Sequence, residues 1–263
     1  AFVEPNDQYY DSQWALNNTG QAVSYNGNYV GTPGSDIDAE RAWEISTGSS
    51  DVIIAILDTG IDLDHPDLQS GIVGGYDFVS NDSNANDGNM HGTACASIAA
   101  GRTNNSIGVS GICWDCSMMP VKVLGDGGSG DYDDIINGVV WASDNGAQVV
   151  SMSLGGGGYV GSFDNAIDYA TSNGTIVISA SGNDNGSISY PAAYENSLAI
   201  GAMSPCNERK SPSSCDGENF WGSNYGSGLD FLAPGVRIHT TTMSGGCTST
   251  FNGTSSACPH AAG

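Results

Sequence analysis

The feature that most constrains the fold is a run of apolar, largely β-branched residues that recurs along the chain. Residues 52–57 are all apolar, which is typical of a strand buried on both faces. Similar runs occupy 119–124, 148–153, 175–180 and 198–202. Helical stripes separate some of them, as at Ile135, Ile136, Val139 and Val140. Alternating strands and helices predict an α/β fold with three layers, in which a mostly parallel, twisted central sheet carries helices on both faces.

The composition excludes some classes of partner. The chain has 263 residues, with 6 Lys and Arg against 29 Asp and Glu, giving a formal charge of −23. Nucleic acid and anionic membrane would both repel such a chain. No run of about 18 apolar residues is present to span a membrane. The chain begins at Ala1 rather than Met, so we expect a mature form from which targeting and pro-segments have been removed.

The seven cysteines suggest an oxidising compartment. Cys206 and Cys215 lie in a loop rich in Pro, Ser and Asn, where a local disulfide is expected. Cys113 and Cys116 form a C-x-x-C motif, which usually signals metal or redox chemistry. Because no second such motif accompanies it, a tight structural disulfide is the better interpretation.

Two of the remaining three cysteines are expected to be free. Cys95 and Cys258 fall on the buried faces of two expected helices, where a thiol behaves as a small apolar group. Cys247 has no obvious partner, and its mate could lie outside the supplied residues.

Three short segments bring together the groups that activate a serine. Asp58 ends the first apolar run, His91 opens a helical pattern, and Ser255 opens another. A serine hydroxyl needs a base to take its proton, and the base needs a carboxylate to fix its tautomer. Taken singly, these residues read as turn or N-cap residues. The order Asp, His, Ser differs from that of α/β-hydrolases and of chymotrypsin-type enzymes.

The flanking residues carry a resemblance to a known family. The blocks ILDTGID at 56–62, HGTACA at 91–96 and NGTSSACPH at 252–260 resemble those of subtilases, the subtilisin-like serine proteases. Similarity extends from about Pro5 to the last residue. The resemblance implies that Ser255 is the nucleophile, that His91 is the general base and then acid, and that Asp58 orients His91. It also implies one peptidase domain over residues 1–263 that lacks the family's C-terminal helices in the supplied chain.

Asn183 matches the asparagine that stabilises the oxyanion in this family. It follows the apolar run at 175–180, so it stands at the carboxyl end of an expected strand. With Asp184, Asn185 and Gly186 it also reads as a turn. Its amide and the backbone N–H of Ser255 at a helix N-terminus would converge on one oxyanion. Pro259 is expected near the first turn of that helix, where a missing N–H costs little.

Substrate is expected to pair with exposed strand edges, as an added β-strand. Without the triad, the glycine-rich stretches among these residues would be read only as loops. Large apolar or aromatic P1 side chains are expected in a roomy pocket, and Asp184 near its mouth could admit Lys or Arg. The residues expected to bind substrate are Gly127, Gly128, Ser129, Gly130, Ser153, Leu154, Gly155, Ala180, Ser181, Gly182 and Ser189.

The resemblance also implies structural calcium. The family's strong site is matched by the side chains of Asp7, Asp67 and Asn105 and by the carbonyls of Thr103, Ile107 and Val109. Oxygen ligands are those that Ca²⁺ requires. A second, thermitase-like site is matched by Asp77 and Asp82, with Ser80 where an Asp is expected. Loops rich in Asp and Asn are otherwise ordinary solvated turns.

These observations predict a secreted, calcium-stabilised serine endopeptidase that works through an acyl-enzyme. Its partners are expected to be protein or peptide substrates and a removed N-terminal propeptide, and the protein is expected to be a monomer. A binding protein on the same fold is the competing hypothesis, but it would lack a triad residue or the oxyanion asparagine. A processing protease of narrow specificity would need a densely acidic cleft, whereas acidic residues here are spread along the chain.

Overall fold

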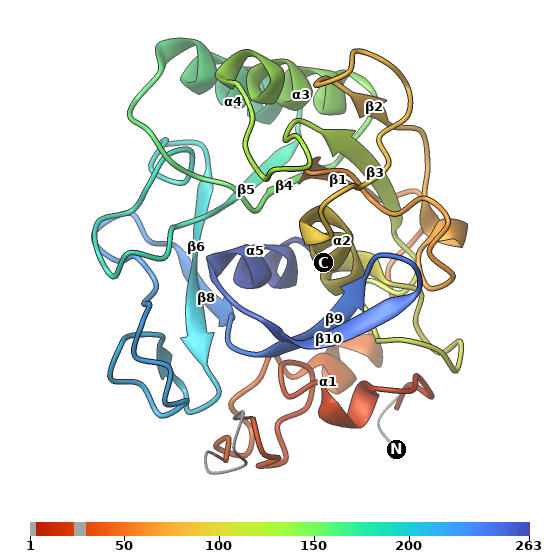
Figure 1. The fold of residues 1–263 in the computed structure, drawn as a ribbon, viewed down its shortest axis with the longest axis vertical. Coiled ribbons are helices and arrows are strands. Elements are labelled where there is room, and N and C mark those ends of the chain that lie inside the picture. Colours follow the sequence, from red (N-terminus) through yellow and green to blue (C-terminus); the bar gives the residue numbers. More distant parts are fainter. Residues whose placement is uncertain (1–3, 24–29) are drawn as a thin grey trace.

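The computed structural model describes residues 4–23 and 30–263. Their central element is an eight-stranded sheet (Figure 1). The strands run in the order β2-β3-β1-β4-β5-β6-β7, with β8 also paired to β6. All neighbours are parallel except β6 and β7. The strands are β1 (Ile53–Asp58), β2 (Tyr76–Asp77), β3 (Ser117–Lys122), β4 (Val149–Met152), β5 (Ile176–Ala180), β6 (Leu198–Ser204), β7 (Glu208–Arg209) and β8 (Phe231–Pro234).

Helices cover both faces of this sheet. In Figure 1, α3 and α4 lie on one side of it, and α2 and α5 lie on the other. An antiparallel hairpin of β9 and β10 packs beyond α2. The remaining elements are α1 (Ala39–Trp43), α2 (His91–Ala100), α3 (Tyr132–Asp144), α4 (Gly161–Ser172), α5 (Thr254–Ala262), β9 (Ile238–Thr242), β10 (Gly246–Phe251) and the 3₁₀ turns η1 (Tyr10–Ser12) and η2 (Gln69–Gly71). The predicted three-layer α/β fold is confirmed.

The central strand β1 shows why the apolar runs are continuous. Ile54 and Ile56 join the core that also contains apolar residues of α2 and α5. Ala55 and Leu57 point to the opposite face and join the core under α3 and α4. Because both faces are covered, successive side chains are buried in two separate cores.

Pro259 departs from the sequence expectation. Helix α5 begins at Thr254, so Pro259 lies inside the helix rather than in its first turn. A proline there cannot donate to the carbonyl four residues earlier, which belongs to Ser255. That carbonyl accepts a hydrogen bond from Ser153 Oγ at 2.8 Å instead. A side chain outside the helix therefore replaces the missing helical hydrogen bond, and it does so at the residue expected to be the nucleophile.

The cysteines are arranged as the sequence suggested. Disulfides join Cys113 to Cys116 and Cys206 to Cys215. Cys95 and Cys258 are buried free thiols, and Cys247 is free and half-buried. Among the described residues, no helix is both long and apolar enough to cross a membrane.

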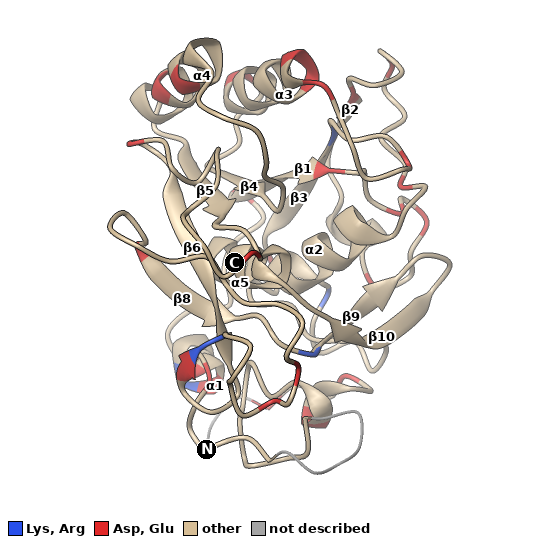
Figure 2. Ribbon diagram, turned by 60° about the vertical axis from the view of Figure 1, so that its left-hand side comes forward, with Lys and Arg blue, Asp and Glu red and all other residues tan. Residues whose placement is uncertain are grey.

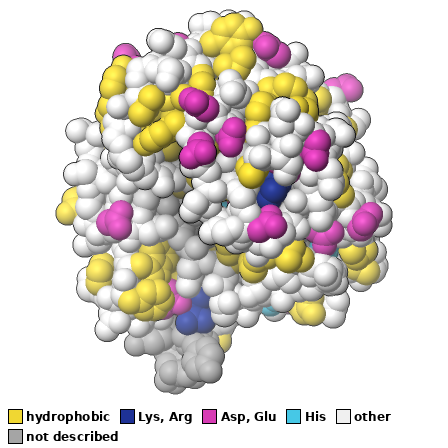
Figure 3. All heavy atoms as spheres, turned by 45° about the horizontal axis from the view of Figure 1, so that its top comes forward, with side chains coloured by type: hydrophobic (Ala, Val, Ile, Leu, Met, Phe, Trp, Pro, Cys, Tyr) yellow, Lys and Arg dark blue, Asp and Glu magenta, His cyan; other side chains and the backbone are white. Residues whose placement is uncertain are grey.

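The acidic residues are distributed over the surface rather than gathered at one place. Figure 2 shows them on many loops and helices, and Figure 3 shows several on the face that comes forward there, with few basic side chains among them. Both lysines of the chain, Lys122 and Lys210, are buried. The outer surface is therefore even poorer in positive charge than the composition implies.

Candidate active site

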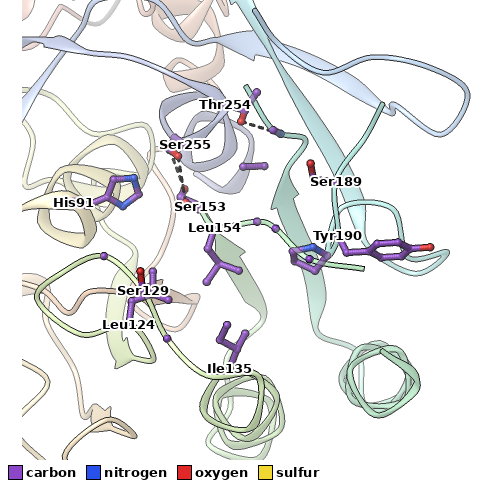
Figure 4. A pocket seen from close by; sticks show the side chains of 18 of the residues that line it. His91, Leu124, Ser129, Ile135, Ser153, Leu154, Ser189, Tyr190, Thr254 and Ser255 are labelled. Atoms are coloured by element: carbon purple, nitrogen blue, oxygen red, sulfur yellow. Dashed lines mark hydrogen bonds between the residues drawn. The ribbon is translucent and has the colours of Figure 1, made fainter. Parts of the chain in front are cut away.

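The residues singled out from the sequence meet at the carboxyl edge of the sheet, where parallel α/β proteins place their sites. Asp58 is the last residue of β1, and Asn183 follows β5. His91 is the first residue of α2, and Ser255 is the second residue of α5. His91, Asn183 and Ser255 all line one cleft of about 700 Å³ (Figure 4).

Asp58 and His91 are hydrogen-bonded. His91 Nδ1 lies 2.7 Å from Asp58 Oδ1, which also accepts the N–H of Thr59 at 2.7 Å. Asp58 is fully buried, and its Oδ2 has no partner among the described residues. Burial alone would lower the pKa of His91, but the charge and hydrogen bond of Asp58, together with the nearby Cys95, raise the pKa above its ordinary value. This contact fixes the tautomer that leaves Nε2 free to accept a proton.

The loop after β1 and the start of α2 are packed backbone against backbone. A Cβ on Gly92 would lie 2.1 Å from the carbonyl oxygen of Gly60, so only glycine fits there. The buried Asp87 carboxylate joins the two segments, accepting from Thr59 Oγ1 at 2.9 Å and from Thr93 Oγ1 at 2.6 Å. Sequence reasoning missed Asp87, which precedes Gly and Asn and reads as a turn residue.

Ser255 and Ser153 form a reciprocal pair of hydrogen bonds. Ser255 Oγ donates to the carbonyl oxygen of Ser153 at 3.2 Å, and Ser153 Oγ donates to the carbonyl oxygen of Ser255 at 2.8 Å (Figure 4). The buried thiol of Cys95 also donates to that Ser255 carbonyl, at 3.5 Å, and lies 3.9 Å from His91 Nδ1. The serine backbone is thus held from two sides while its hydroxyl remains at the cleft.

Asn183 is oriented by the residue before the serine. Its Oδ1 accepts the N–H of Thr254 at 2.8 Å and Thr254 Oγ1 at 3.1 Å. Thr254 Oγ1 in turn accepts the N–H of Gly182 at 3.1 Å. Since Oδ1 is occupied by two donors, the amide orientation is determined, and the Nδ2 donor has no protein acceptor among the described residues. An anion in the cleft beside Ser255 would find this donor free.

Most of the residues expected to bind substrate line the cleft, and two do not. Gly127 lies outside the lining, and Ser181 is buried, with its Oγ 3.4 Å from the carbonyl of Asn224. The lining contains the expected residues Gly128, Ser129, Gly130, Ser153, Leu154, Gly155, Ala180, Gly182 and Ser189. It also contains Leu124, Tyr132, Ile135, Phe163, Tyr190 and Pro191, which sequence reasoning did not select.

Asn224, also missed from the sequence, supports one end of this cleft. Its side chain is buried, its Nδ2 donates to Ser189 Oγ at 3.2 Å, and its Oδ1 accepts the N–H groups of Asp184 and Gly186 at 2.9 and 3.1 Å. A Cβ on Gly182 would lie 2.3 Å from Asn224 Nδ2. The segment from Gly182 to Ser189 is therefore fixed around one amide. No local motif marks Asn224.

Three of the expected calcium ligands, Asp7, Asp67 and Asn105, lie together. Asp7 and Asp67 are both buried, and neither has an ion-pair partner among the described residues. Asn105 Nδ2 donates to Asp67 Oδ1 at 2.7 Å, and the N–H of Asn105 donates to Asp7 Oδ1 at 2.9 Å. Burial raises the pKa of Asp67, and the nearby Asp7 adds to this effect. Two buried carboxylates joined through Asn105 fit a hard cation on charge and donor type.

The carboxylates of the expected second calcium site, Asp77 and Asp82, accept hydrogen bonds from their own loop. Asp77 and Asp82 pair through their backbones, with N···O distances of 2.8 and 3.0 Å. Asp77 Oδ1 accepts the N–H of Ser80 at 2.9 Å, and Asp82 Oδ1 accepts the N–H of Asn84 at 2.8 Å. Each carboxylate therefore caps its own turn, and Asp82 is exposed.

The fold and the order of these groups around one cleft are those of the subtilisin-like class. The chain belongs to the subtilase family, whose model matches residues 49–263. It is 38% identical over 263 residues to a thermophilic serine proteinase of Bacillus sp. strain AK1, covering 100% of this chain and 61% of that protein. It is 43% identical over 231 residues to thermitase of Thermoactinomyces vulgaris, covering 86% of this chain and 77% of thermitase.

Solved structures give the same result. The proteases of Pseudoalteromonas arctica superpose with a TM-score of 0.82 at 32% identity, covering 99% of this chain and 85% of theirs. A cold adapted subtilisin-like serine proteinase gives a TM-score of 0.73 at 29% identity, covering 95% of this chain and 82% of that one.

Proposed function

We propose that this chain is the catalytic domain of a secreted serine endopeptidase that cleaves peptide bonds through an acyl-enzyme intermediate. The observation that carries the proposal is the 2.7 Å contact between Asp58 and His91 at a cleft that also contains Ser255 and Asn183. A binding protein with this fold would not need these four groups, whereas this chain has all of them. Family membership supports the same reaction.

In the proposed reaction, the Ser255 hydroxyl turns from the Ser153 carbonyl towards His91 Nε2. His91 takes the proton as Ser255 Oγ attacks the substrate carbonyl, and Asp58 stabilises the imidazolium. Negative charge develops on the substrate oxygen, where Asn183 Nδ2 and the backbone N–H of Ser255 stabilise it at the N-terminus of α5. His91 then protonates the leaving amine, and water releases the acyl group by the same steps in reverse.

The substrate is proposed to lie as an extended peptide between two backbone edges, Gly128 to Gly130 and Ser153 to Gly155. Small residues there let the peptide backbone approach closely. Leu124, Ile135 and Leu154 offer apolar contacts in the cleft (Figure 4). The end near Ser189 combines the small residues Ala180 and Gly182 with Tyr190 and Pro191. This lining favours large apolar or aromatic P1 side chains, with Asp184 available to Lys or Arg.

Calcium is proposed at the first group of ligands only. Asp7, Asp67 and Asn105 would hold it with the carbonyls of Thr103, Ile107 and Val109. Bound there, the ion would neutralise two buried carboxylates and stabilise the folded state. The second group is not proposed, because its carboxylates cap their own turns.

Secretion is supported by the two disulfides, which persist in oxidising compartments. A propeptide removed before activity and a monomeric state are proposed with it.

Hydrolysis of chromogenic tetrapeptide anilides ending in Phe, Leu, Ala or Arg tests this function. We expect turnover that decreases from Phe and Leu to Ala. Turnover of none of the four by the folded protein would contradict the proposed peptidase activity, and preference for Arg would contradict the assigned P1 pocket.

A further inference from the structure

A disulfide-closed loop lies between β6 and β8, and it has its own buried ion pair. The disulfide joins Cys206 to Cys215. Lys210 is fully buried; its Nζ donates to Asp216 Oδ1 at 2.8 Å and to Ser214 Oγ at 3.1 Å. Lys210 Nζ also donates to the carbonyl of Glu218, so hydrogen bonds from one ammonium tie residues 210 to 218 together. The loop therefore presents its next residues in a defined position.

Glu218 leaves this ordered loop and points its carboxylate into a set of donors. Its N–H donates to Asp216 Oδ1 at 2.9 Å, and the residue is 5% exposed. Arg237 Nη2 contacts Oε1 at 2.8 Å, and Trp221 Nε1 donates to Oε2 at 2.9 Å. Asn252 Nδ2 lies 3.2 Å from Oε1 and 3.0 Å from Oε2. Every group around the carboxylate is a donor, so only an ionised acid satisfies them all.

Asn252 is held on its other side as well. Its Oδ1 accepts the N–H of Arg237 at 2.6 Å, so both ends of the amide are engaged. Next to it, the N–H of Gly253 donates to the carbonyl of Gly235 at 2.9 Å. Gly253 has a backbone φ of +118°, a conformation that residues other than glycine rarely adopt. The Glu218 contact therefore helps fix the turn that leads into α5.

The same turn leads directly to the reacting groups. Thr254 follows Gly253 and orients Asn183 through two hydrogen bonds, and Ser255 comes next. A displacement at Asn252 would therefore move both the nucleophile and the oxyanion donor. We propose that Glu218 is a positioning residue of this peptidase, acting through Asn252 on Ser255 and Asn183. The inference rests on the function proposed above.

Glu218→Gln tests the role with little change in shape. Its amide nitrogen would have to face Trp221, Arg237 or Asn252, all of them donors, so the turn should shift. Small displacements of reacting groups lower the chemical rate more than they weaken substrate binding. We expect kcat per active site to fall at least about 10-fold, with KM within about 2-fold.

Glu208→Gln is the matched control, because it removes the same charge from the same loop. Glu208 Oε1 accepts the N–H of Cys215 at 2.9 Å and does not contact the turn before Ser255. Both variants and the parent are assayed on a tetrapeptide anilide ending in Phe, at a temperature where each is folded. Active sites are counted with a phosphonate that reacts with the nucleophile. The control should keep the parent's kcat.

Asn252→Ala removes the same Glu218–Asn252 contact by changing the other residue. This variant also tests the positioning role if Glu218→Gln does not fold. Asn252→Ala should lower kcat about as much as Glu218→Gln does. In the double variant, Glu218→Gln should lower kcat by less than about 3-fold relative to Asn252→Ala alone. Equal losses in both backgrounds, or a kcat within 2-fold of the parent for either single variant, would overturn the positioning role. A parent that neither hydrolyses the peptide nor reacts with the phosphonate would instead mark failure of the proposed function.

Discussion

Ser153 and Ser255 are joined by two hydrogen bonds, in which the hydroxyl of each residue donates to the backbone carbonyl of the other. The bond from Ser153 replaces the helical N–H that Pro259 cannot provide. We therefore predict that Ser153→Ala lowers the free energy of unfolding by about 1 kcal/mol, because it leaves the half-buried Ser255 carbonyl poorly satisfied. Urea unfolding measures this. Ser153→Thr keeps the hydroxyl and should lose less, and equal losses in the two variants would argue against the role of this bond.

Asn183 is predicted to stabilise the transition state rather than the bound substrate. Asn183→Leu keeps the size of the side chain and removes the donor. We expect kcat to fall by roughly 10²–10³, with KM changed little. Steady-state kinetics of the folded variant check this, and a rise in KM with an unchanged kcat would assign Asn183 to substrate binding instead.

The Asp58–His91 contact predicts the pH dependence of activity. His91 acts as a base only when it is neutral, and Asp58 raises its pKa above the ordinary value. The acid limb of kcat/KM should therefore have its midpoint above about 6.5. Asp58→Asn should move this midpoint to lower pH and reduce kcat by about 10⁴. A midpoint that stays where it was in Asp58→Asn would mean that another group controls the limb.

His260 predicts part of the acid sensitivity of the fold. It is buried in α5, its Nδ1 donates to the carbonyl of Ser256 at 2.7 Å, and burial lowers its pKa to about 4. In the unfolded chain the imidazole titrates near 6.5, so between these values the unfolded state binds more protons. Its contribution to stability is therefore lost as pH falls from about 6.5 to 4, by at most about 3 kcal/mol.

His260→Gln should remove that part of the pH dependence while keeping a donor and an acceptor in place. Urea unfolding of the variant and the parent at several pH values between 4 and 7 measures the difference. Parallel curves would show that His260 has the same pKa in the folded and unfolded states, which would contradict this prediction.

Removal of calcium is predicted to lower stability through the first ligand group. A cation at 100 times its Kd stabilises the folded state by about 2.7 kcal/mol. Excess chelator should therefore lower the Tm of the parent, and Asp67→Asn should abolish the response to calcium. Asp82→Asn is the matched control and should respond as the parent does. A response lost in Asp82→Asn and kept in Asp67→Asn would place the ion at the other group.

The sequence predicted what depends on short-range pattern. The apolar runs located β1, β3, β4, β5 and β6 within one or two residues, because burial on both faces leaves a continuous signal. The short strands β2 and β7 and the later strands β8, β9 and β10 were not predicted. The short motifs located Asp58, His91 and Ser255. By contrast, Glu218 meets Asn252 across 34 residues, in a loop without a motif, and nothing local marks the pairing.

Other parts of the site were also outside the reach of pattern. Asp87 reads as a turn residue and no local motif marks Asn224, since the role of each depends on partners that tertiary folding brings to it. The sequence analysis placed Pro259 too early in the helix, because nothing local shows that Ser153 Oγ donates to the Ser255 carbonyl, 102 residues away, which the proline leaves without a helical partner.

The central claim is that Ser255 is a nucleophile activated by His91. A phosphonate that reacts with activated serines tests it directly, through the intact mass of the protein and the position of the modified residue. The account predicts one adduct, on Ser255, that is absent from Ser255→Ala and formed much more slowly by His91→Ala. Ser256→Ala, one residue away, should still be labelled. An adduct on another serine, or rapid labelling of Ser255→Ala, would contradict the claim.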